Sequence, residues 1–70
     1  MRSVGYDRTD QVLEVEFQSG DIYQYLDVPP VIYEELSSAE SKGKYFNSEI
    51  RDTYEFVRLD RRRQRAGKSH

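Results

Sequence analysis

The first part of the chain alternates apolar and polar positions with the two-residue period of a β-strand. Three such runs occur at residues 3–7 (SVGYD), 12–17 (VLEVEF) and 21–26 (DIYQYL). The polar connections between them, residues 8–11 and 18–20, are too short for a parallel crossover. We therefore expect an antiparallel meander of three strands.

The turn at residues 18–20 (QSG) leaves two registers open for the second hairpin. If its last two residues form a two-residue loop, Phe17 faces Ile22 across the hairpin. If the loop has three residues and Gly20 sits in a bulge, Phe17 faces Asp21 instead. Because the three-residue loop needs a positive φ only at glycine, turn chemistry favours the second register.

The register decides where Tyr23 and Tyr25 point, since a one-residue slip moves every side chain of a strand to the other face. In the first register the two rings lie beside glutamates, and Ile22 and Leu26 join the core, which the apolar pattern mildly favours. In the second register both rings join the apolar face. Ile22 and Leu26 then form an apolar patch on the outer face of the sheet.

Residues 29–43 (PPVIYEELSSAESKG) predict a helix. Two prolines suit its first turn, and an apolar stripe follows at i, i+4 and i+7 from Ile32. Gly43 is expected to follow the last turn as the C′ residue. Ser37 and Glu40 also match a capping box, which leaves one helix and two short helices as open alternatives.

A second helix start signal lies at Asn47, a favourable N-cap residue, and we expect a short helix over residues 48–53. Residues 54–59 (YEFVRL) alternate again and predict a fourth strand, which we place beside the first strand. The expected fold class is therefore α+β. It is a small antiparallel sheet of three to four strands, in the order β-β-β-α-α-β, with the helices packed on one face.

Composition excludes several kinds of site. The chain has no cysteine, and its single histidine is His70, so it holds no disulfide, no thiolate metal site and no cysteine nucleophile. We expect no catalytic residue, no metal and no cofactor. No apolar run approaches the roughly 20 residues of a membrane span, and the N-terminus lacks the apolar core of a signal peptide. We therefore expect a cytoplasmic protein that does not contact a membrane.

The net charge of −2 hides a division between two parts of the chain. Residues 1–57 hold five basic and twelve acidic residues, a net charge of −7, while residues 58–70 hold six basic and one acidic residue, a net charge of +5. Residues 60–70 (DRRRQRAGKSH) have almost no apolar side chains to bury. We expect one domain at residues 1–59 and a basic, disordered tail at residues 60–70.

A set of short motifs between Val4 and Phe56 resembles the KTSC domain, a small bacterial module found alone and at the C-terminus of some lysyl-tRNA synthetases. The motifs are Val4-Gly5-Tyr6-Asp7, the alternating Leu13, Val15 and Phe17, Ser19-Gly20, Tyr23-x-Tyr25, Val28-Pro29, Tyr33, Leu36, Ala39, Ser41-x-Gly43, Tyr45-Phe46-Asn47, Ile50-Arg51 and Tyr54. The Tyr-x-Tyr pair is the hallmark of that family. The resemblance implies RNA binding, by association with the synthetases, and no enzymatic activity.

Two groups of side chains are candidates for binding RNA or another anion. The first consists of Lys42, Lys44, Tyr45 and Arg51, because these residues adjoin the helix start expected at Asn47, where backbone N–H groups hold anions. The second group is the arginine run of the tail, which would bind any polyanion by counterion release. Its members are Arg61, Arg62, Arg63 and Arg65. The structural alternatives are lysines that are merely solvated and a terminus that only aids solubility.

Tyr23 and Tyr25 are open to two interpretations, a stacking platform for bases or part of a tyrosine-rich core. We favour the structural role, because the rings are flanked by glutamates in one register and covered in the other. The sequence predicts a non-catalytic module that binds RNA. The alternative is a protein–protein adaptor that uses Ile22 and Leu26 on the outer sheet face.

Overall fold

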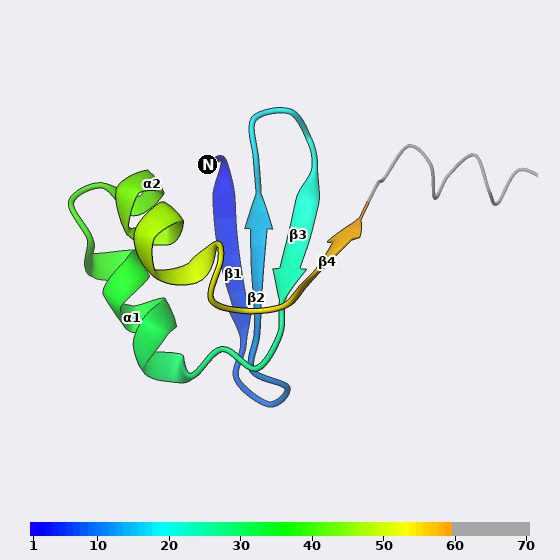
Figure 1. Cartoon of the computed structure of the whole chain (residues 1–70), viewed down its shortest axis with the longest axis vertical. Coiled ribbons are helices and arrows are strands. Elements are labelled where there is room, and N and C mark those ends of the chain that lie inside the picture. The colour runs from blue at the N-terminus through cyan, green and yellow to red at the C-terminus, as the bar shows by residue number, and fades with distance from the viewer. Residues whose placement is uncertain (60–70) are drawn as a thin grey trace, which may run out of the picture.

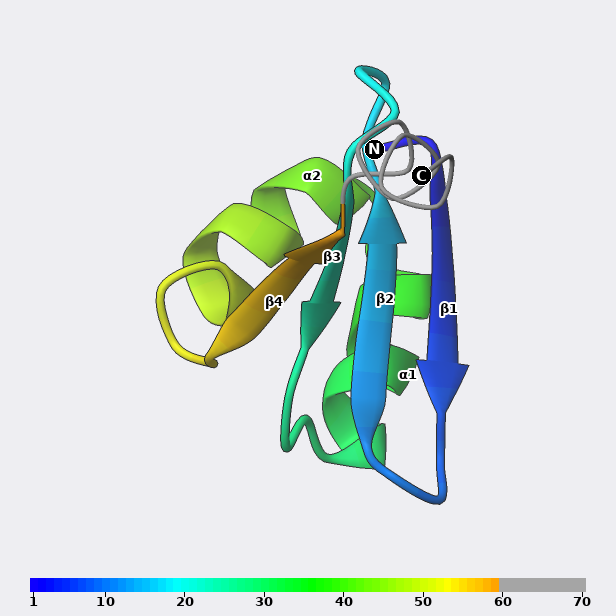
Figure 2. The same ribbon diagram turned by 90° about the vertical axis from the view of Figure 1, so that its right-hand side faces the viewer.

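The computed structural model describes residues 1–59, which form a four-stranded antiparallel sheet with helices on one face (Figure 1). Figure 2 shows the opposite face of the sheet, with the helices behind it. The elements are β1 (Ser3–Asp7), β2 (Val12–Glu16), β3 (Ile22–Tyr25), α1 (Pro30–Ser38), α2 (Lys42–Tyr45), the π-helical segment η1 (Phe46–Ile50) and β4 (Phe56–Leu59). The α+β fold class expected from the sequence is confirmed.

The strands follow one another in the order β1-β2-β3-β4, and each pair is antiparallel. The placement of the fourth strand beside the first was therefore wrong. The chain leaves η1 next to β3, where the Leu26 N–H donates a hydrogen bond to the Glu55 carbonyl at 2.8 Å. This contact starts the β3–β4 ladder, so β1 and β4 become the two edges of the sheet (Figure 2).

The second hairpin has the register that turn chemistry favoured. The Phe17 N–H donates to the Asp21 carbonyl at 3.0 Å, and the Gly20 N–H donates to the Phe17 carbonyl at 2.9 Å. Gly20 has a φ of 96°, a conformation that glycine adopts without steric cost. Val15 and Leu13 of β2 are therefore paired with Tyr23 and Tyr25 of β3, and both tyrosines face the helices.

Two short helices occupy the region where the sequence left one or two helices open. The break lies later than the capping box predicted, because α1 ends at Ser38 and Ala39 is extended with a ψ of 141°. Ser41 is the N-cap of α2, and its Oγ accepts a hydrogen bond from the Lys44 N–H at 3.3 Å. Gly43 lies inside α2, so its assignment as a helix-ending residue was wrong.

No new helix starts at Asn47, contrary to the sequence-based expectation. The chain passes directly from α2 into η1, and Asn47 lies within this continuous helical run. The Arg51 N–H donates to the Phe46 carbonyl at 2.9 Å, the i→i+5 spacing of a π-helix. The β4 strand then begins at Phe56 rather than Tyr54. A helix N-terminus at Asn47 is therefore not available to bind an anion.

The core lies between the inner face of the sheet and the helices. Its buried members come from every layer of the fold, and they are Leu13, Val15, Tyr25, Val28, Leu36, Phe46 and Ile50. On α1, Leu36 is fully buried, while Val31 is 52% exposed. None of the helices within residues 1–59 is both long and apolar enough to cross a lipid bilayer.

The outer face of the sheet differs from the expected apolar patch. Ile22 lies there, on the face opposite Tyr23, but it is only 5% exposed, and Leu26 is half-buried. Leu59 of β4 is paired directly with Ile22. The predicted exposure of Ile22 was wrong because the fourth strand lies beside β3 rather than beside β1.

Candidate functional site

A groove of about 390 Å³ lies between η1 and the inner face of β3. It is open to solvent along one side, and both the β2–β3 hairpin and the end of η1 contribute to it. Its lining residues are Phe17, Ser19, Asp21, Tyr23, Tyr25, Phe46, Asn47 and Arg51. The hairpin register puts Tyr23 and Tyr25 on one face of β3, and Asp21, which precedes this strand, lines the same groove.

Aromatic rings form the floor of the groove. The ring of Tyr23 is edge-on to Phe17, with centroids 5.3 Å apart and an angle of 82° between the planes. It is nearly parallel to the ring of Phe56 on β4, at 5.1 Å and 24°. Phe56 is 49% exposed and Tyr23 is half-buried. Phe56 does not line the groove, and its ring packs against that of Tyr23.

Tyr25 has a more enclosed environment than Tyr23. Only 2% of Tyr25 is exposed, and its ring meets that of Phe46 edge-on, with centroids 5.3 Å apart. Burial raises the pKa of the Tyr25 hydroxyl above its ordinary value, and the neighbouring Tyr23 adds to the increase. The positive charge of Arg51, which lines the same groove, acts in the opposite direction on this pKa. Tyr25 thus belongs to the buried core and also lines the groove.

The polar side chains on the helical wall are positioned by η1. The π-helical turn is wider than an α-helical one, and Asn47 and Arg51, four residues apart, both line the groove. Phe46 and Ile50 on the same turn are buried in the core. Single π-turns within α-helical runs are frequent at functional sites. This turn sends two side chains into the core and two side chains to the groove.

A carboxylate lies at the hairpin end of the groove. Asp21 Oδ2 accepts a hydrogen bond from Arg58 Nη2 and another from Ser19 Oγ, each at 3.2 Å. A carboxylate has about four acceptor positions, so two donors leave part of its capacity for a ligand. The hairpin end of the groove therefore holds an ion pair between Asp21 and Arg58, and Arg51 also lines the groove.

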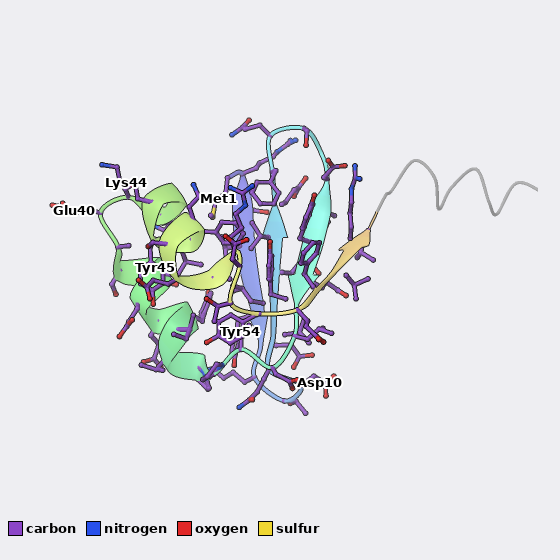
Figure 3. The ribbon with its side chains drawn as sticks, viewed as in Figure 1. Met1, Asp10, Glu40, Lys44, Tyr45 and Tyr54 are labelled. Atoms are coloured by element: carbon purple, nitrogen blue, oxygen red, sulfur yellow. The ribbon has the colours of Figure 1, made fainter. Side chains whose placement is uncertain are left out.

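The predicted cation cluster is divided by the fold. Arg51 lines the groove, whereas neither Lys42 nor Lys44 is among the lining residues. Both lysines are exposed on α2, and Figure 3 shows Lys44 beside Glu40, on the side of the helices away from the sheet. The arginines predicted at positions 61, 62, 63 and 65 lie outside the described residues, as does the rest of the expected tail.

Tyr45 joins the two helices rather than lining the groove. Its hydroxyl donates a hydrogen bond to Glu35 Oε1 of α1 at 2.6 Å (Figure 3). This hydrogen bond, together with desolvation, raises the pKa of Tyr45 to about 12. The observed contact gives Tyr45 a structural role in holding α2 against α1.

Five of the groove residues were not named as site residues from the sequence: Phe17, Ser19, Asp21, Phe46 and Asn47. The sequence could have indicated the two residues that flank the hairpin turn, Phe17 and Asp21. The favoured register places both on the same face as Tyr23. No comparable signal exists for Asn47, since its position depends on the π-helical turn. Within residues 1–59 the structure brings together no three potential metal ligands of the His, Cys, Asp or Glu type.

Comparison with known proteins identifies the family. The sequence model of the KTSC domain family matches residues 1–54 of this chain. The chain belongs to the KTSC domain family. Its fold resembles the crystal structure of a KTSC domain protein from Yersinia pestis, with a TM-score of 0.80 and 34% sequence identity over 83% of this chain and 82% of that one.

The KTSC domain occurs in two settings among the relatives. An uncharacterised protein of Stutzerimonas stutzeri is 44% identical over 61 residues, which cover 86% of each chain. A lysine–tRNA ligase of Nostoc punctiforme is 39% identical over 59 residues, which make up 84% of this chain but only 10% of the ligase. The KTSC domain is thus homologous both to small separate proteins and to a short region of lysine–tRNA ligases.

Proposed function

We propose that this KTSC domain is a non-catalytic module that binds RNA through the groove between η1 and β3. The observation that carries the proposal is the half-buried ring of Tyr23 in the groove, together with the polar side chains of Asn47 and Arg51 that line it. Proteins that bind single-stranded nucleic acid stack bases on such rings, and each stack contributes roughly 1–3 kcal/mol. The homologous region of lysine–tRNA ligases supports the same function, because those enzymes act on tRNA.

The charge of the domain makes additional cations necessary. The net charge of −7 on residues 1–57 repels a polyanion, and Arg51 alone does not offset it. In the proposed mode the groove holds bases, while Lys42, Lys44 and the arginines at positions 61–65 contact phosphates. Phosphate contacts supply affinity without distinguishing one base from another. The groove and the basic side chains outside it therefore have separable roles.

The proposal is tested by fluorescence anisotropy of labelled single-stranded RNA and of tRNA with the full chain. We expect affinity to fall steeply as salt rises, because each phosphate contact adds about 0.7 to the slope of log K against log salt. Removal of residues 60–70 should flatten that slope. Tyr23→Ala should instead weaken binding by roughly 5- to 150-fold with little change in slope.

A matched control separates the groove from general charge effects. Lys42→Gln and Lys44→Gln change the charge of α2 without altering the groove, so they should lower the salt slope and leave base stacking intact. If neither tRNA nor mixed-sequence RNA binds the full chain at low salt, the proposed function is wrong.

A protein–protein adaptor is the second candidate, and it would use the outer face of the sheet. Val57, paired with Gln24 on that face, is 46% exposed, while Ile22 is buried. The discriminating variant is therefore Val57→Lys rather than a change at Ile22, which would bury a charge. An adaptor should recover a defined protein in a pull-down with nuclease present and should lose it in Val57→Lys. An unchanged pull-down would count against this surface.

A further inference from the structure

The two edge strands of the sheet differ in how well they are protected against pairing with another strand. An edge strand exposes backbone N–H and C=O groups, and short length or charged side chains oppose further pairing. β4 has four residues and includes Arg58. β1 has five residues, with neither a proline nor a basic residue, and its one acidic residue, Asp7, is its last. None of the helices in residues 1–59 lies beyond its free side (Figure 2).

The hydrogen bonds of β2 show which way its backbone groups point. In an antiparallel pair, residues whose N–H and C=O groups bond to one neighbour alternate with residues whose groups point to the other side. The Phe17 N–H donates to the Asp21 carbonyl, so every second residue counted back from Phe17 is bonded to β3. The residues between them point to β1, and the Arg2 N–H accordingly donates to the Glu16 carbonyl at 2.6 Å.

The same alternation decides which backbone groups of β1 point to the open side. The residues of β1 that lie opposite the β1-facing residues of β2 are Ser3, Gly5 and Asp7, so these three bond to β2. Val4 and Tyr6 lie between them, and their N–H and C=O groups therefore point away from the sheet. Within residues 1–59 no hydrogen bond joins these four groups to another segment.

β1 has one register in which it is complementary to itself. Side chains alternate between faces, so opposite residues in two antiparallel copies differ by an even number of positions, and the two-fold axis passes beside one residue. An axis at Gly5 pairs Val4 with Tyr6 of the second copy, and all the open groups are used. An axis at Val4 would need the Arg2 N–H, which already donates within the sheet. An axis at Tyr6 would need Arg8, which lies in the turn after β1.

The side chains of β1 also match across an axis at Gly5. On the inner face, Val4 lies opposite Tyr6 of the second copy, and aromatic and β-branched residues form favourable cross-strand pairs. Both side chains are half-buried in one chain, so pairing covers them further. On the outer face, Ser3 lies opposite Asp7. Within β1, therefore, no two like charges face each other.

Gly5 lies at the axis, and nothing in the domain requires a glycine there. A Cβ atom added to Gly5 would meet no atom of another segment within 4 Å. Among the glycines of residues 1–59, only Gly20 has a positive φ. In the paired strands the two Gly5 residues form a pair without hydrogen bonds, with Cα atoms about 4.5 Å apart. Glycine inside a strand often marks a place where another backbone approaches closely.

We infer that two copies of this chain associate through β1, paired in antiparallel about Gly5 to form one continuous eight-stranded sheet. The two-fold axis is perpendicular to the sheet, so both helical layers lie on the same side. The grooves between η1 and β3 lie far from the axis, toward the two ends of the joined sheet. The inference concerns a separate surface and does not rest on the proposed RNA binding.

The small size of this contact sets its strength. Five residues a side are far fewer than the roughly 20–30 residues a side of a stable interface. The net charge of −7 on residues 1–57 of each copy adds repulsion, which salt screens. The association is therefore weak and reversible, and it is best measured at high salt.

The first test is sedimentation equilibrium of the nuclease-treated full chain at high salt. We expect the average mass to rise from one chain toward two chains between micromolar and millimolar protein. Over the same range the NMR amide resonances of Val4 and Tyr6 should shift. A chain that stays monomeric at millimolar concentration, or a dimer whose formation shifts the resonances of β4 instead, would overturn the inference.

Cross-linking tests the register. The chain has no cysteine, so Gly5→Cys introduces a single thiol. An axis at Gly5 places the two Cα atoms about 4.5 Å apart, within the roughly 4.4–6.8 Å of disulfides. With diamide as oxidant, this variant should form a covalent dimer. Ser3→Cys is the matched control, because it is equally exposed on the same face but lies roughly 13 Å from its counterpart. Equal rates in the two variants would show that the register is wrong.

Val4→Pro tests the outward backbone groups. It removes an N–H that points away from β2, so the β1–β2 ladder stays complete while each dimer loses two hydrogen bonds. Dimerisation should weaken roughly tenfold or more. Circular dichroism checks that the variant is folded, and if it is not, the cross-linking result decides alone. If folded Val4→Pro dimerises as well as the parent, β1 is not the interface and the inference fails.

Discussion

The inner face of the sheet has two halves that differ in how far the helices cover them. Over β2 the cover is complete, since Leu13 and Val15 are fully buried, and on β1 Tyr33 stacks on the half-buried Tyr6 at 5.1 Å. Over β3 and β4 the cover ends at η1, which buries Tyr25 and leaves Tyr23 and Phe56 partly open. Aromatic side chains occur in both halves, so helix cover rather than residue type separates the core from the groove.

Tyr23 and Tyr25 show the difference within one strand. They are two residues apart, share one face of β3 and have rings 6.3 Å apart. Tyr25 lies under Phe46 and is buried, whereas Tyr23 lies beyond the reach of η1 and lines the open part of the groove. The Tyr-x-Tyr motif therefore has one member in the covered half and one in the open half.

The largest expected effect is on stability at Tyr25. Tyr25→Ala removes a buried ring and should lower the free energy of unfolding by about 3–5 kcal/mol, a large part of the total for a domain of this size. Tyr23→Ala should cost roughly 1–2 kcal/mol, because its ring is only half-buried. Urea unfolding followed by circular dichroism measures both. Equal losses in the two variants would contradict the division of the face into two halves.

The next largest effect concerns the helix that closes the covered half. Leu36→Ala should reduce the free energy of unfolding by about 2–5 kcal/mol, since it opens a cavity between α1 and the sheet. Val31→Ala on the same helix is the matched control, because Val31 is 52% exposed, and its change should stay within about 0.5 kcal/mol. Thermal unfolding of the pair provides the measurement. A small loss in Leu36→Ala would show that α1 is not what closes this half.

The smallest effect is a pH dependence in the contact that holds α2 against α1. The hydrogen bond to Glu35 raises the pKa of Tyr45 from an ordinary value of 10.0 to about 12 in the folded protein. A raised pKa favours the neutral hydroxyl in the folded state, so this contribution is fully present below pH 10 and is lost as the pH rises to about 12. The stability difference between the parent and Tyr45→Phe should therefore shrink across that window.

Glu35→Gln provides the control for this pH dependence. It removes the charged acceptor and keeps a hydrogen-bonding side chain, so Tyr45 should titrate closer to pH 10. Tyrosine absorbance at 295 nm, a wavelength at which the ionised phenol absorbs, follows the titration directly. If the Tyr45 titration is the same in Glu35→Gln and in the parent, the hydrogen bond is not what raises the pKa.

The strands and their faces were predictable because their pattern is local. Turn chemistry at Gly20 favoured the observed hairpin register, since only Gly20 adopts a positive φ in that turn, whereas the apolar pattern mildly favoured the other register. The helix boundaries were less predictable. The capping box predicted an N-cap at Ser37, whereas the structure uses Ser41 as the N-cap of α2.

The candidate site was predicted only in part. Tyr23, Tyr25 and Arg51 were singled out from the sequence, but Arg51 was grouped with lysines that lie on another part of the helical layer. The groove exists because the helical run through η1 places Asn47 and Arg51 opposite β3, and because the β2–β3 hairpin brings Phe17 next to Tyr23. The first of these features depends on contacts between residues far apart in the chain, which no local pattern encodes.

The amino-acid sequence by itself determined the α+β class and the meander, and its glycine at position 20 favoured the observed hairpin register, because alternation and turn stereochemistry act over a few neighbouring residues. Only the tertiary structure decided which strand β4 joins, where the helices break and which aromatic rings stay open to solvent. Those outcomes depend on how far the helical layer extends across the sheet. That extent is set by packing among distant side chains, and it separates the buried Tyr25 from the partly exposed Tyr23.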